Sequence, residues 1–286
     1  MLGHVLYRAC ARRFDAYATV RSEGLSEAAA GALDEDRTLL GVRAEDPASV
    51  EGAMERCGAE VVINCIGVVK QRVDEVGPVE TIRTNALFPH QLAEICGRRR
   101  ARLIHVSTDC VFSGRGGGYT ETDMADPEDV YGRSKLLGEP DGTGVLTIRT
   151  SMIGRELRSS NGLLEWALSQ SGEVRGFTAA RFTGPTAPVL ADAIADLIER
   201  QPTLEGTWHL GAEPISKHDL LVLLRDAFQL EIEIVPDDSV KVDRSLDSSR
   251  LRAATGWAPP AWPEMVAALA GAATEHPESR SPVARR

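Results

Sequence analysis

The sequence predicts an α/β protein: a Rossmann-like, doubly wound parallel sheet with a smaller C-terminal substrate lobe. Short β-branched runs alternate with longer amphipathic stretches, which is typical of βαβ units. The 286 residues are enough for one such domain and an appended lobe. After Arg149 the polar loops lengthen and the expected strands shorten, which indicates where the lobe begins.

The first half of the chain provides most of the predicted sheet. Asp46 and Pro47 fit an N-cap followed by a first-turn proline, so a helix is expected to begin there. The apolar run from Glu60 to Ile66 does not alternate, which predicts a strand buried on both faces. We expect helices at Leu2–Arg13, Pro47–Arg56, Asn85–Arg99 and Val130–Glu139, and strands at Ala16–Val20, Glu60–Ile66, Arg102–Ser107 and Val145–Arg149.

The second half predicts shorter elements. The expected division is a nucleotide-binding domain over residues 1–150, a substrate lobe over residues 151–272 and a disordered tail over residues 273–286, which lacks periodicity. In the lobe we expect helices at Gly162–Gln170, Val189–Arg200, Lys217–Phe228 and Trp262–Ala270, and strands at Thr207–Leu210 and Glu231–Val235.

The beginning of the chain is unusual for this fold. A doubly wound nucleotide-binding domain opens with a strand, a glycine-rich turn and a helix whose N-terminus faces a pyrophosphate. This chain opens on the helix, and Gly3 stands where the last glycine of such a turn would be. We therefore expect the first strand and the earlier glycines to be missing, either because the start is placed too late or because the protein is truncated.

Composition excludes several classes of function. The net charge of −10 disfavours a nucleic-acid or anionic-membrane partner. The five cysteines are scattered without a CxxC motif or a Cys/His cluster, so neither a disulfide framework nor a metal site is expected, and a reducing cytoplasm fits best. No apolar run approaches the ~20 residues that span a bilayer.

Tyr131 and Lys135 are the main candidate catalytic residues. They lie four positions apart on a predicted helix, so both side chains face the same cleft. A neighbouring ammonium is expected to lower the pKa of the phenol and make it a usable acid or base near neutral pH. A Tyr and Lys at this spacing also occur by chance as a surface helical pair. The neighbouring features therefore decide whether the pair is catalytic.

Two strand ends extend the candidate site. Thr108 directly follows a buried strand, and ligands of such sheets bind beyond the carboxyl ends of the strands. Its hydroxyl can therefore face a substrate carbonyl beside Tyr131, although a strand-end cap is the alternative. Gly67 ends the preceding strand and would let a ligand approach the backbone.

Arg21 bears on the choice of cofactor. It lies just past the second strand position, where an acidic residue would hold the ribose of NAD and an arginine the 2′-phosphate of NADP. NADP is therefore slightly favoured over NAD, and a solvated surface arginine is the alternative.

At this point the chain resembles the dTDP-4-dehydrorhamnose reductases of the extended short-chain dehydrogenase/reductase superfamily, from Gly3 to about Pro263. The resemblance rests on the motifs Ser107–Gly114, Tyr131–Lys135, Arg149–Ser151, Arg181–Thr186 and Arg244–Leu251. It implies a catalytic triad of Thr108, Tyr131 and Lys135, and a homodimer. It places Cys65, Ile66 and Gly67 along the cofactor, and Thr108, Asp109 and Met152 near the sugar nucleotide.

The resemblance predicts the NAD(P)H-dependent reduction of a 4-keto group on a nucleotide-linked deoxysugar, for cell-surface polysaccharide precursors. Arg181 and Arg244 are candidates for the pyrophosphate, because a guanidinium matches phosphate geometry. The chain departs from the reductases at Met152, where they usually carry an aromatic residue, and at Arg43, where an acidic residue is common near the adenine.

Three other functions stay open. A 4,6-dehydratase resembles the chain around Thr108 but typically carries Glu where this chain has Cys110. An NAD-dependent sugar-nucleotide epimerase can use the same Tyr131 and Lys135. A non-catalytic NADP-binding subunit, like the regulatory beta subunit of methionine adenosyltransferase, is the alternative from a different class.

Overall fold

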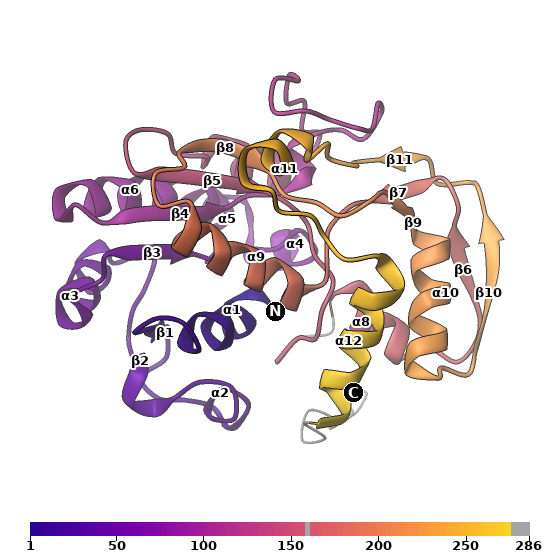
Figure 1. Ribbon diagram of the computed structural model, residues 1–286, viewed down its shortest axis with the longest axis horizontal. Coiled ribbons are helices and arrows are strands. Elements are labelled where there is room, and N and C mark those ends of the chain that lie inside the picture. The colour runs from indigo at the N-terminus through magenta and orange to yellow at the C-terminus, as the bar shows by residue number, and fades with distance from the viewer. Residues whose placement is uncertain (158–160, 276–286) are drawn as a thin grey trace.

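The computed structural model describes residues 1–157 and 161–275. A sheet of four parallel strands lies at its centre, in the order β3-β4-β5-β8 (Figure 1). A separate parallel pair, β1-β2, lies below β3 in the same view. The strand bounds are β1 Ala18–Thr19, β2 Thr38–Leu39, β3 Val61–Asn64, β4 Arg102–Val106, β5 Val145–Arg149 and β8 Gly206–His209.

Helices cover both faces of the four-stranded sheet. On one face, Ile104 of β4 packs in a core with α1 (Leu2–Ala11) and α9 (Ala187–Arg200). On the other face, Leu103 packs against α3 (Pro47–Cys57) and α6 (Phe88–Arg99). Successive side chains of a strand point to opposite faces, so β4 contributes side chains to both cores. The prediction of a doubly wound α/β sheet is confirmed.

Strand β3 differs from its prediction. Val61, Val62 and Ile63 are only half-buried, whereas the sequence indicated a strand buried on both faces. In the described part of the chain β3 pairs with β4 alone, so its other edge and its flanks are less covered. The α3 helix begins as predicted, with Asp46 accepting the Ala48 N–H and Pro47 in the first turn.

Helix α7 (Val130–Leu137) carries the candidate catalytic pair. Asp129 caps it by accepting the Gly132 N–H at 2.7 Å. A Cβ at Gly132 would overlap the Cys110 carbonyl, so the glycine lets α7 lie directly on the turn after β4. The neighbouring segments are α2 (Glu27–Ala30), η1 (Glu35–Arg37), η2 (Lys70–Arg72), α4 (Val73–Val76), α5 (Pro78–Ile82), the π-helical turn η3 (Arg83–Leu87) and η4 (Asp109–Val111).

The smaller lobe has its own core and two small sheets. Strand β6 (Gly172–Phe177) pairs with β10 (Ile232–Asp237), and β7 (Ala180–Phe182) lies between β9 (Ile215–Ser216) and β11 (Val242–Asp243). Leu164, Leu220 and Met265 belong to its apolar core. The lobe helices are α8 (Leu163–Leu168), α10 (Lys217–Phe228), α11 (Ser249–Thr255) and α12 (Trp262–Glu275).

Two late elements return to the central sheet. Strand β8 lies within the stretch assigned to the lobe from sequence, yet it pairs with β5, and α9 packs in the core of the sheet. In the register of the sheet, Thr147 and Ile148 of β5 lie opposite Thr207 and Trp208 of β8. Helix α12 continues to Glu275, beyond the predicted start of the tail, and residues 276–286 lie outside the described residues.

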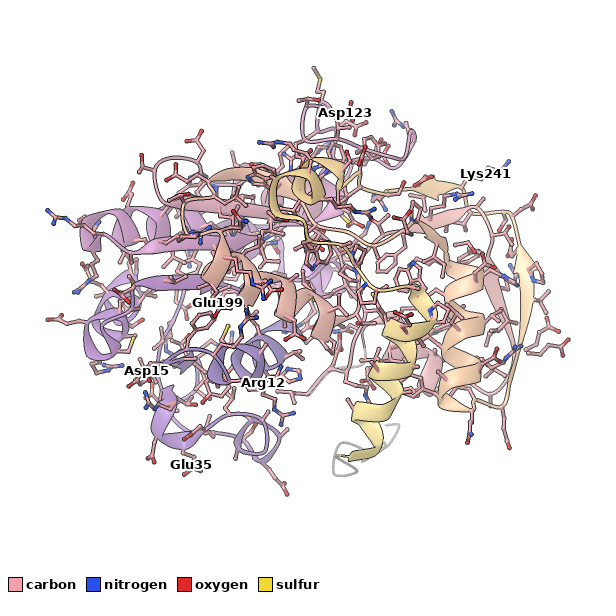
Figure 2. All side chains as sticks on the ribbon, viewed as in Figure 1. Arg12, Asp15, Glu35, Asp123, Glu199 and Lys241 are labelled. Atoms are coloured by element: carbon pink, nitrogen blue, oxygen red, sulfur yellow. The ribbon has the colours of Figure 1, made fainter. Side chains whose placement is uncertain are left out.

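Charged side chains such as Asp15, Glu35 and Asp123 lie at the outside of the molecule (Figure 2). Over residues 1–157 and 161–275, no helix is long and apolar enough to cross a membrane.

Candidate active site

The predicted site residues gather at the carboxyl ends of neighbouring strands. Residues 65–67 follow β3, Ser107 and Thr108 follow β4, and α7 lies beside both. Gly3, in the first turn of α1, is close to the same edge, because a Cβ there would lie 4.0 Å from Cys65 Cβ. This is the edge at which ligands of doubly wound sheets bind.

The Thr108 side chain lies near enough to Tyr131 to lower the pKa of its phenol. Thr108 also accepts the Cys110 N–H at 3.2 Å and lies 3.2 Å from Asp109 Oδ1, so the turn after the strand fixes its rotamer. Thr108 is buried and Tyr131 is half-buried. The Thr108 hydroxyl after β4 and the Tyr131 phenol on α7 therefore lie in the same part of the cleft.

The pKa of Tyr131 is raised, which is opposite to the direction expected from sequence. Burial is the main cause, and the nearby Cys110 adds to it, while the Thr108 side chain opposes both. Loss of water disfavours the phenolate. In this state the tyrosine is a protonated acid.

Lys135 lies in the protein interior, one helical turn beyond Tyr131. Its Nζ donates to the Val106 carbonyl at 2.8 Å and lies 3.4 Å from His105 Nε2. Burial lowers the pKa of Lys135 to about 8, while Glu139 and Cys65 oppose that shift. The amine therefore titrates much closer to neutrality than an exposed lysine.

Asn85 was not predicted as a site residue, yet it organises the loop after β3. Its Oδ1 accepts the Val68 N–H at 2.8 Å, and its Nδ2 donates to the Val68 carbonyl and to Ser134 of α7. A Cβ at Gly67 would meet Asn85 Oδ1 at 3.3 Å, so this glycine makes room for a contact within the protein. The π-helical turn that carries Asn85 thus connects the loop to helix α7.

Basic side chains surround Asp109 on the lobe side of the cleft. Arg244 and Lys217 both interact electrostatically with Asp109, and Lys70 with Lys217. Arg244 Nε donates to the Phe112 carbonyl at 2.9 Å, which holds the guanidinium near the turn after β4. The sequence predicted Asp109 and Arg244 but missed both lysines, which carry no local motif.

Lys217, the first residue of α10, also lines a pocket of about 290 Å³. Lys217 and Arg175 provide positive charge, and Trp166 and Phe177 provide aromatic surface. The remaining lining residues are aliphatic: Leu163, Ala180, Leu221, Val240 and Val242. The pocket can accommodate a flat ring beside an anionic group.

Three other predicted residues lie apart from Tyr131. Arg181 is 54% exposed and pairs with Asp243, with Nε 3.8 Å from Oδ2. Met152 is half-buried and packs against the core of the central sheet. Arg21 is exposed just after β1.

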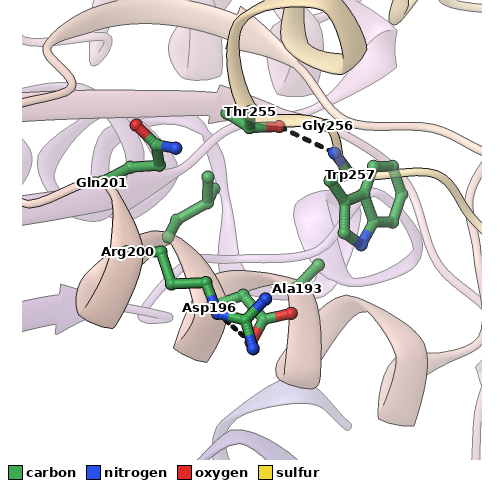
Figure 3. A pocket seen from close by; sticks show the side chains of 8 residues that line it. Ala193, Asp196, Arg200, Gln201, Thr255, Gly256 and Trp257 are labelled. Atoms are coloured by element: carbon green, nitrogen blue, oxygen red, sulfur yellow. Dashed lines mark hydrogen bonds and ion pairs between the residues drawn. The ribbon is translucent and has the colours of Figure 1, made fainter.

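A small pocket of about 90 Å³ between α9 and α11 contains none of the predicted site residues (Figure 3). Asp196 and Arg200 form an ion pair on one wall, and Thr255 accepts the Trp257 N–H on the other. The adjacent Leu197 carbonyl accepts from Arg102 at the beginning of β4, so this pocket lies at the opposite edge of the sheet.

Comparison with known proteins extends these observations. The family model described as "RmlD substrate binding domain" matches residues 1–274. The dTDP-4-dehydrorhamnose reductase of Mycobacterium tuberculosis is 40% identical over 124 residues, which are 40% of this chain and 40% of that protein. The chain thus matches well under two thirds of that relative. The probable low-salt glycan biosynthesis reductase Agl14 of Haloferax volcanii is 28% identical over 84% of this chain and 87% of that protein.

Solved structures share the fold. The hypothetical dTDP-4-dehydrorhamnose reductase from Sulfolobus tokodaii has a TM-score of 0.73 and 25% identity, covering 91% of this chain and 94% of that one. The Bacillus anthracis dTDP-4-dehydrorhamnose reductase in complex with NADP has a TM-score of 0.71 and 18% identity, covering 89% and 97%. The match across residues 1–274 confirms the resemblance seen in the motifs, and the chain belongs to the RmlD substrate binding domain family.

Proposed function

We propose that this protein reduces the 4-keto group of a nucleotide-linked deoxysugar, dTDP-4-dehydrorhamnose or a close relative, with NADPH or NADH. The proximity of Thr108 to the Tyr131 phenol carries this proposal, because it brings two hydroxyl groups to the same part of the cleft. The relatives named as dTDP-4-dehydrorhamnose reductases support the choice of sugar.

The residues at the sheet edge fit a nicotinamide cofactor. Helix α1 has no acidic residue in its first turn and no side-chain cap, so its N–H groups and dipole favour an anion such as a pyrophosphate. Cys65 and Ile66 present exposed side chains beside it. We assign Gly3 and residues 65–67 to the cofactor together with Tyr131 and Lys135, and Arg21 to the 2′-phosphate of NADP.

In this scheme Tyr131 is the acid and gives its proton to the carbonyl oxygen. Thr108 polarises the same carbonyl by donating a hydrogen bond. Lys135 bonds the ribose beside the nicotinamide through an N–H that its bonds to Val106 and His105 leave available. The cofactor, when bound, supplies the hydride.

The cations around Asp109 are the proposed site of the substrate's pyrophosphate. Arg244 and Lys217 would face its phosphates, and Asp109 would hold the sugar. The pocket of Trp166 and Phe177 would take the base. Arg181 of the lobe and Met152 beside the central sheet are proposed as peripheral substrate contacts.

Substitution of Thr108 tests this arrangement. Thr108→Val keeps the shape and removes the hydroxyl, so turnover should fall about 10²- to 10³-fold. Thr108→Ser keeps the hydroxyl and should retain most activity. Equal activity of the Val and Ser variants would contradict the proposed role.

Cofactor stoichiometry separates the reductase from the epimerase. A reductase consumes one NADPH for each sugar nucleotide, whereas an epimerase consumes none. We expect equimolar consumption with dTDP-4-dehydrorhamnose. Turnover of the sugar without loss of NADPH would instead identify an epimerase, and NADPH binding without turnover would identify a non-catalytic subunit.

A homodimer through α5 and α7 is part of the proposal. Val79 and Ile82 of α5 are 72% and 47% exposed, and Leu137 of α7 is 66% exposed. The two helices are in contact, and we assign these exposed apolar side chains to the surface that a second copy would cover. We expect a dimer by analytical ultracentrifugation and a monomer for the double variant with Val79→Asp and Leu137→Asp; an unchanged mass would contradict the interface.

The proposed setting is the cytoplasm, where the product would be a precursor of cell-surface polysaccharide. The Haloferax relative named as a glycan biosynthesis reductase supports this setting. Loss of surface rhamnose or a related sugar on deletion of the gene is the expected phenotype, and unchanged surface glycans would contradict it.

A further inference from the structure

Two segments that are distant in the chain are hydrogen-bonded to each other beside the candidate site. One is the turn after β4, and the other is the segment 243–247 at the end of β11. The Arg244 guanidinium donates through Nε to the Phe112 carbonyl at 2.9 Å, although the two residues are 132 positions apart. The Asp243 N–H donates to the Gly114 carbonyl at 2.7 Å. The candidate pyrophosphate cation is therefore held by the turn that follows the catalytic strand end.

Gly114 is where the two segments approach most closely. Its φ of +88° lies in the left-handed region that glycine adopts without strain. A Cβ there would lie 3.0 Å from Arg244 Cγ, so the arginine stem packs directly on the glycine backbone. The place of the guanidinium thus depends on the conformation of the turn at Gly114.

The Tyr119 hydroxyl holds that turn in its conformation. It accepts the Gly114 N–H at 3.2 Å and the Gly116 N–H at 3.0 Å. The Tyr119 ring stacks on Phe112, with the ring centroids 4.2 Å apart and an interplanar angle of 5°. The hydroxyl and the ring therefore fix the two residues, Gly114 and Phe112, whose carbonyls accept from the segment 243–247.

The Tyr119 backbone holds the same segment further along. Its N–H donates to the Ser245 carbonyl at 2.9 Å, and its carbonyl accepts the Asp247 N–H at 2.7 Å. The same carbonyl accepts from His209 Nδ1 at 2.9 Å, and His209 is the last residue of β8. One tyrosine thus connects the turn after β4, the segment from the lobe and the central sheet.

We propose that Tyr119 is a positioning residue for the substrate's pyrophosphate, acting through Arg244. This inference rests on the proposed function, in which Arg244 faces the phosphates together with Lys217 beside Asp109. The phosphate contact has to lie at a fixed distance from Thr108, where the sugar reacts. An arginine side chain has many rotamers, and the contacts made by Tyr119 restrict them before the substrate binds.

The first test observes Arg244 without any substrate. In the full-length protein labelled with ¹⁵N-arginine, the Nε–H of Arg244 is assigned with Arg244→Lys, and its hydrogen exchange with water is measured. Tyr119→Phe keeps the ring and loses the hydroxyl, so this exchange should become about two- to tenfold faster, the effect of losing one hydrogen bond. A wild-type rate equal to that of free arginine, or an unchanged rate in the folded variant, would overturn the proposal.

Two controls show whether the effect is local. The Arg8 Nε–H donates to a backbone carbonyl of another segment and should exchange at the same rate in wild type and Tyr119→Phe. Tyr17→Phe also removes a phenol hydroxyl, beside Arg37, and should leave the exchange of Arg244 unchanged. Equal acceleration of Arg8 and Arg244 would show a general loosening of the protein and overturn the proposal, as would acceleration of Arg244 by Tyr17→Phe.

Ser245→Ala decides if Tyr119→Phe does not fold. The Ser245 hydroxyl accepts the Gly118 N–H at 2.8 Å and donates to Asp243 Oδ1 at 2.5 Å, so it belongs to the same connection. Its loss should also accelerate the exchange of the Arg244 Nε–H, and an unchanged rate would overturn the proposal.

A double-mutant cycle tests whether the contact acts on the substrate. Tyr119→Phe alone should raise KM for the sugar nucleotide about two- to tenfold and change kcat less than about twofold, because Thr108 and Tyr131 stay in place. In Arg244→Ala the same substitution should leave KM unchanged, because the group through which Tyr119 acts is gone. A fall in kcat alone, or an equal rise in KM in both backgrounds, would indicate a merely structural role and overturn the proposal. Absence of NADPH consumption by wild type would count against the proposed reductase only, and the exchange rates would then decide.

Discussion

Arg149 and Glu139 form a buried ion pair, with Arg149 Nη2 2.7 Å from Glu139 Oε2 and both side chains under 10% exposed. The same carboxylate accepts from Ser107 at 2.6 Å. One carboxylate therefore connects the ends of β4 and β5 to the segment after α7. This connection holds Thr108, the neighbour of Ser107, in place beside helix α7.

Removal of that carboxylate's charge should destabilise the fold. Glu139→Gln leaves the Arg149 guanidinium buried without its counter-ion, and such losses cost about 3–5 kcal/mol. We expect a corresponding fall in the free energy of unfolding, measured in urea. The exposed pair of Glu55 with Arg99 provides the control, since Glu55→Gln should cost less than about 1 kcal/mol. Equal effects of the two substitutions would contradict the assigned role.

Because α7 packs directly on the turn after β4, Gly132 should not tolerate a larger residue. In Gly132→Ala the new methyl group would overlap the Cys110 carbonyl, so α7 must shift and carry Tyr131 away from Thr108. Turnover should fall at least about tenfold. Gly97→Ala on α6 is the matched control, because nothing lies within 4 Å of its Cβ, and it should be neutral or slightly stabilising. Retained activity of Gly132→Ala would argue against this packing.

Substitution of the two candidate arginines, Arg244 and Arg181, should change KM to different extents. Arg244 lies with Asp109 and Lys217, so Arg244→Ala should raise KM at least about tenfold, as loss of a charged contact costs more than ~1.4 kcal/mol. Arg181 is 54% exposed and already paired with Asp243, so Arg181→Ala should change KM less. Steady-state kinetics of both variants decide, and a larger effect at Arg181 would reverse the assignment of the pyrophosphate site.

The lowered pKa of Lys135 predicts that the contribution of this residue to stability rises at alkaline pH. Its pKa is about 8 in the folded protein and about 10.4 in an unfolded chain. Between these values the unfolded state binds more protons at this site, so the contribution of Lys135 to the free energy of unfolding should increase with pH across that window. The contribution is on the order of 3 kcal/mol. The raised pKa of buried cysteines such as Cys65 acts in the opposite direction, so the measured quantity is the difference between wild type and Lys135→Met in urea unfolding. That difference should grow with pH in favour of the wild type, whereas a constant difference would disprove it.

Local signals predicted much of the fold. Strand β5 and helix α10 have the predicted bounds, because Val145–Arg149 is a compact apolar run and Ser216 caps the start of α10. Strands β2, β6, β7, β9 and β11 were not predicted from the sequence. Their pairing depends on partners far away in the chain, as in Gly172 with Ile232, and leaves little pattern in the sequence.

Sequence motifs likewise predict some residues of the candidate site and not others. Thr108, Tyr131 and Lys135 follow from motifs whose spacing fixes their geometry. Lys217 and Asn85 have no local signature, since the first comes next to Asp109 and the second next to Val68 only in the folded chain. The raised pKa of Tyr131 also depends on burial, which the four-residue spacing to Lys135 does not reveal.

Turnover by Tyr131→Phe tests the central claim most directly. The purified protein is mixed with NADPH and dTDP-4-dehydrorhamnose, and loss of the reduced nicotinamide absorbance is followed for wild type and variant. We predict equimolar consumption by wild type and a loss of about 10²- to 10⁴-fold in the variant, because Phe cannot give the proton. Turnover by Tyr131→Phe at the wild-type rate, or no consumption by either protein when both bind NADPH, would contradict the account.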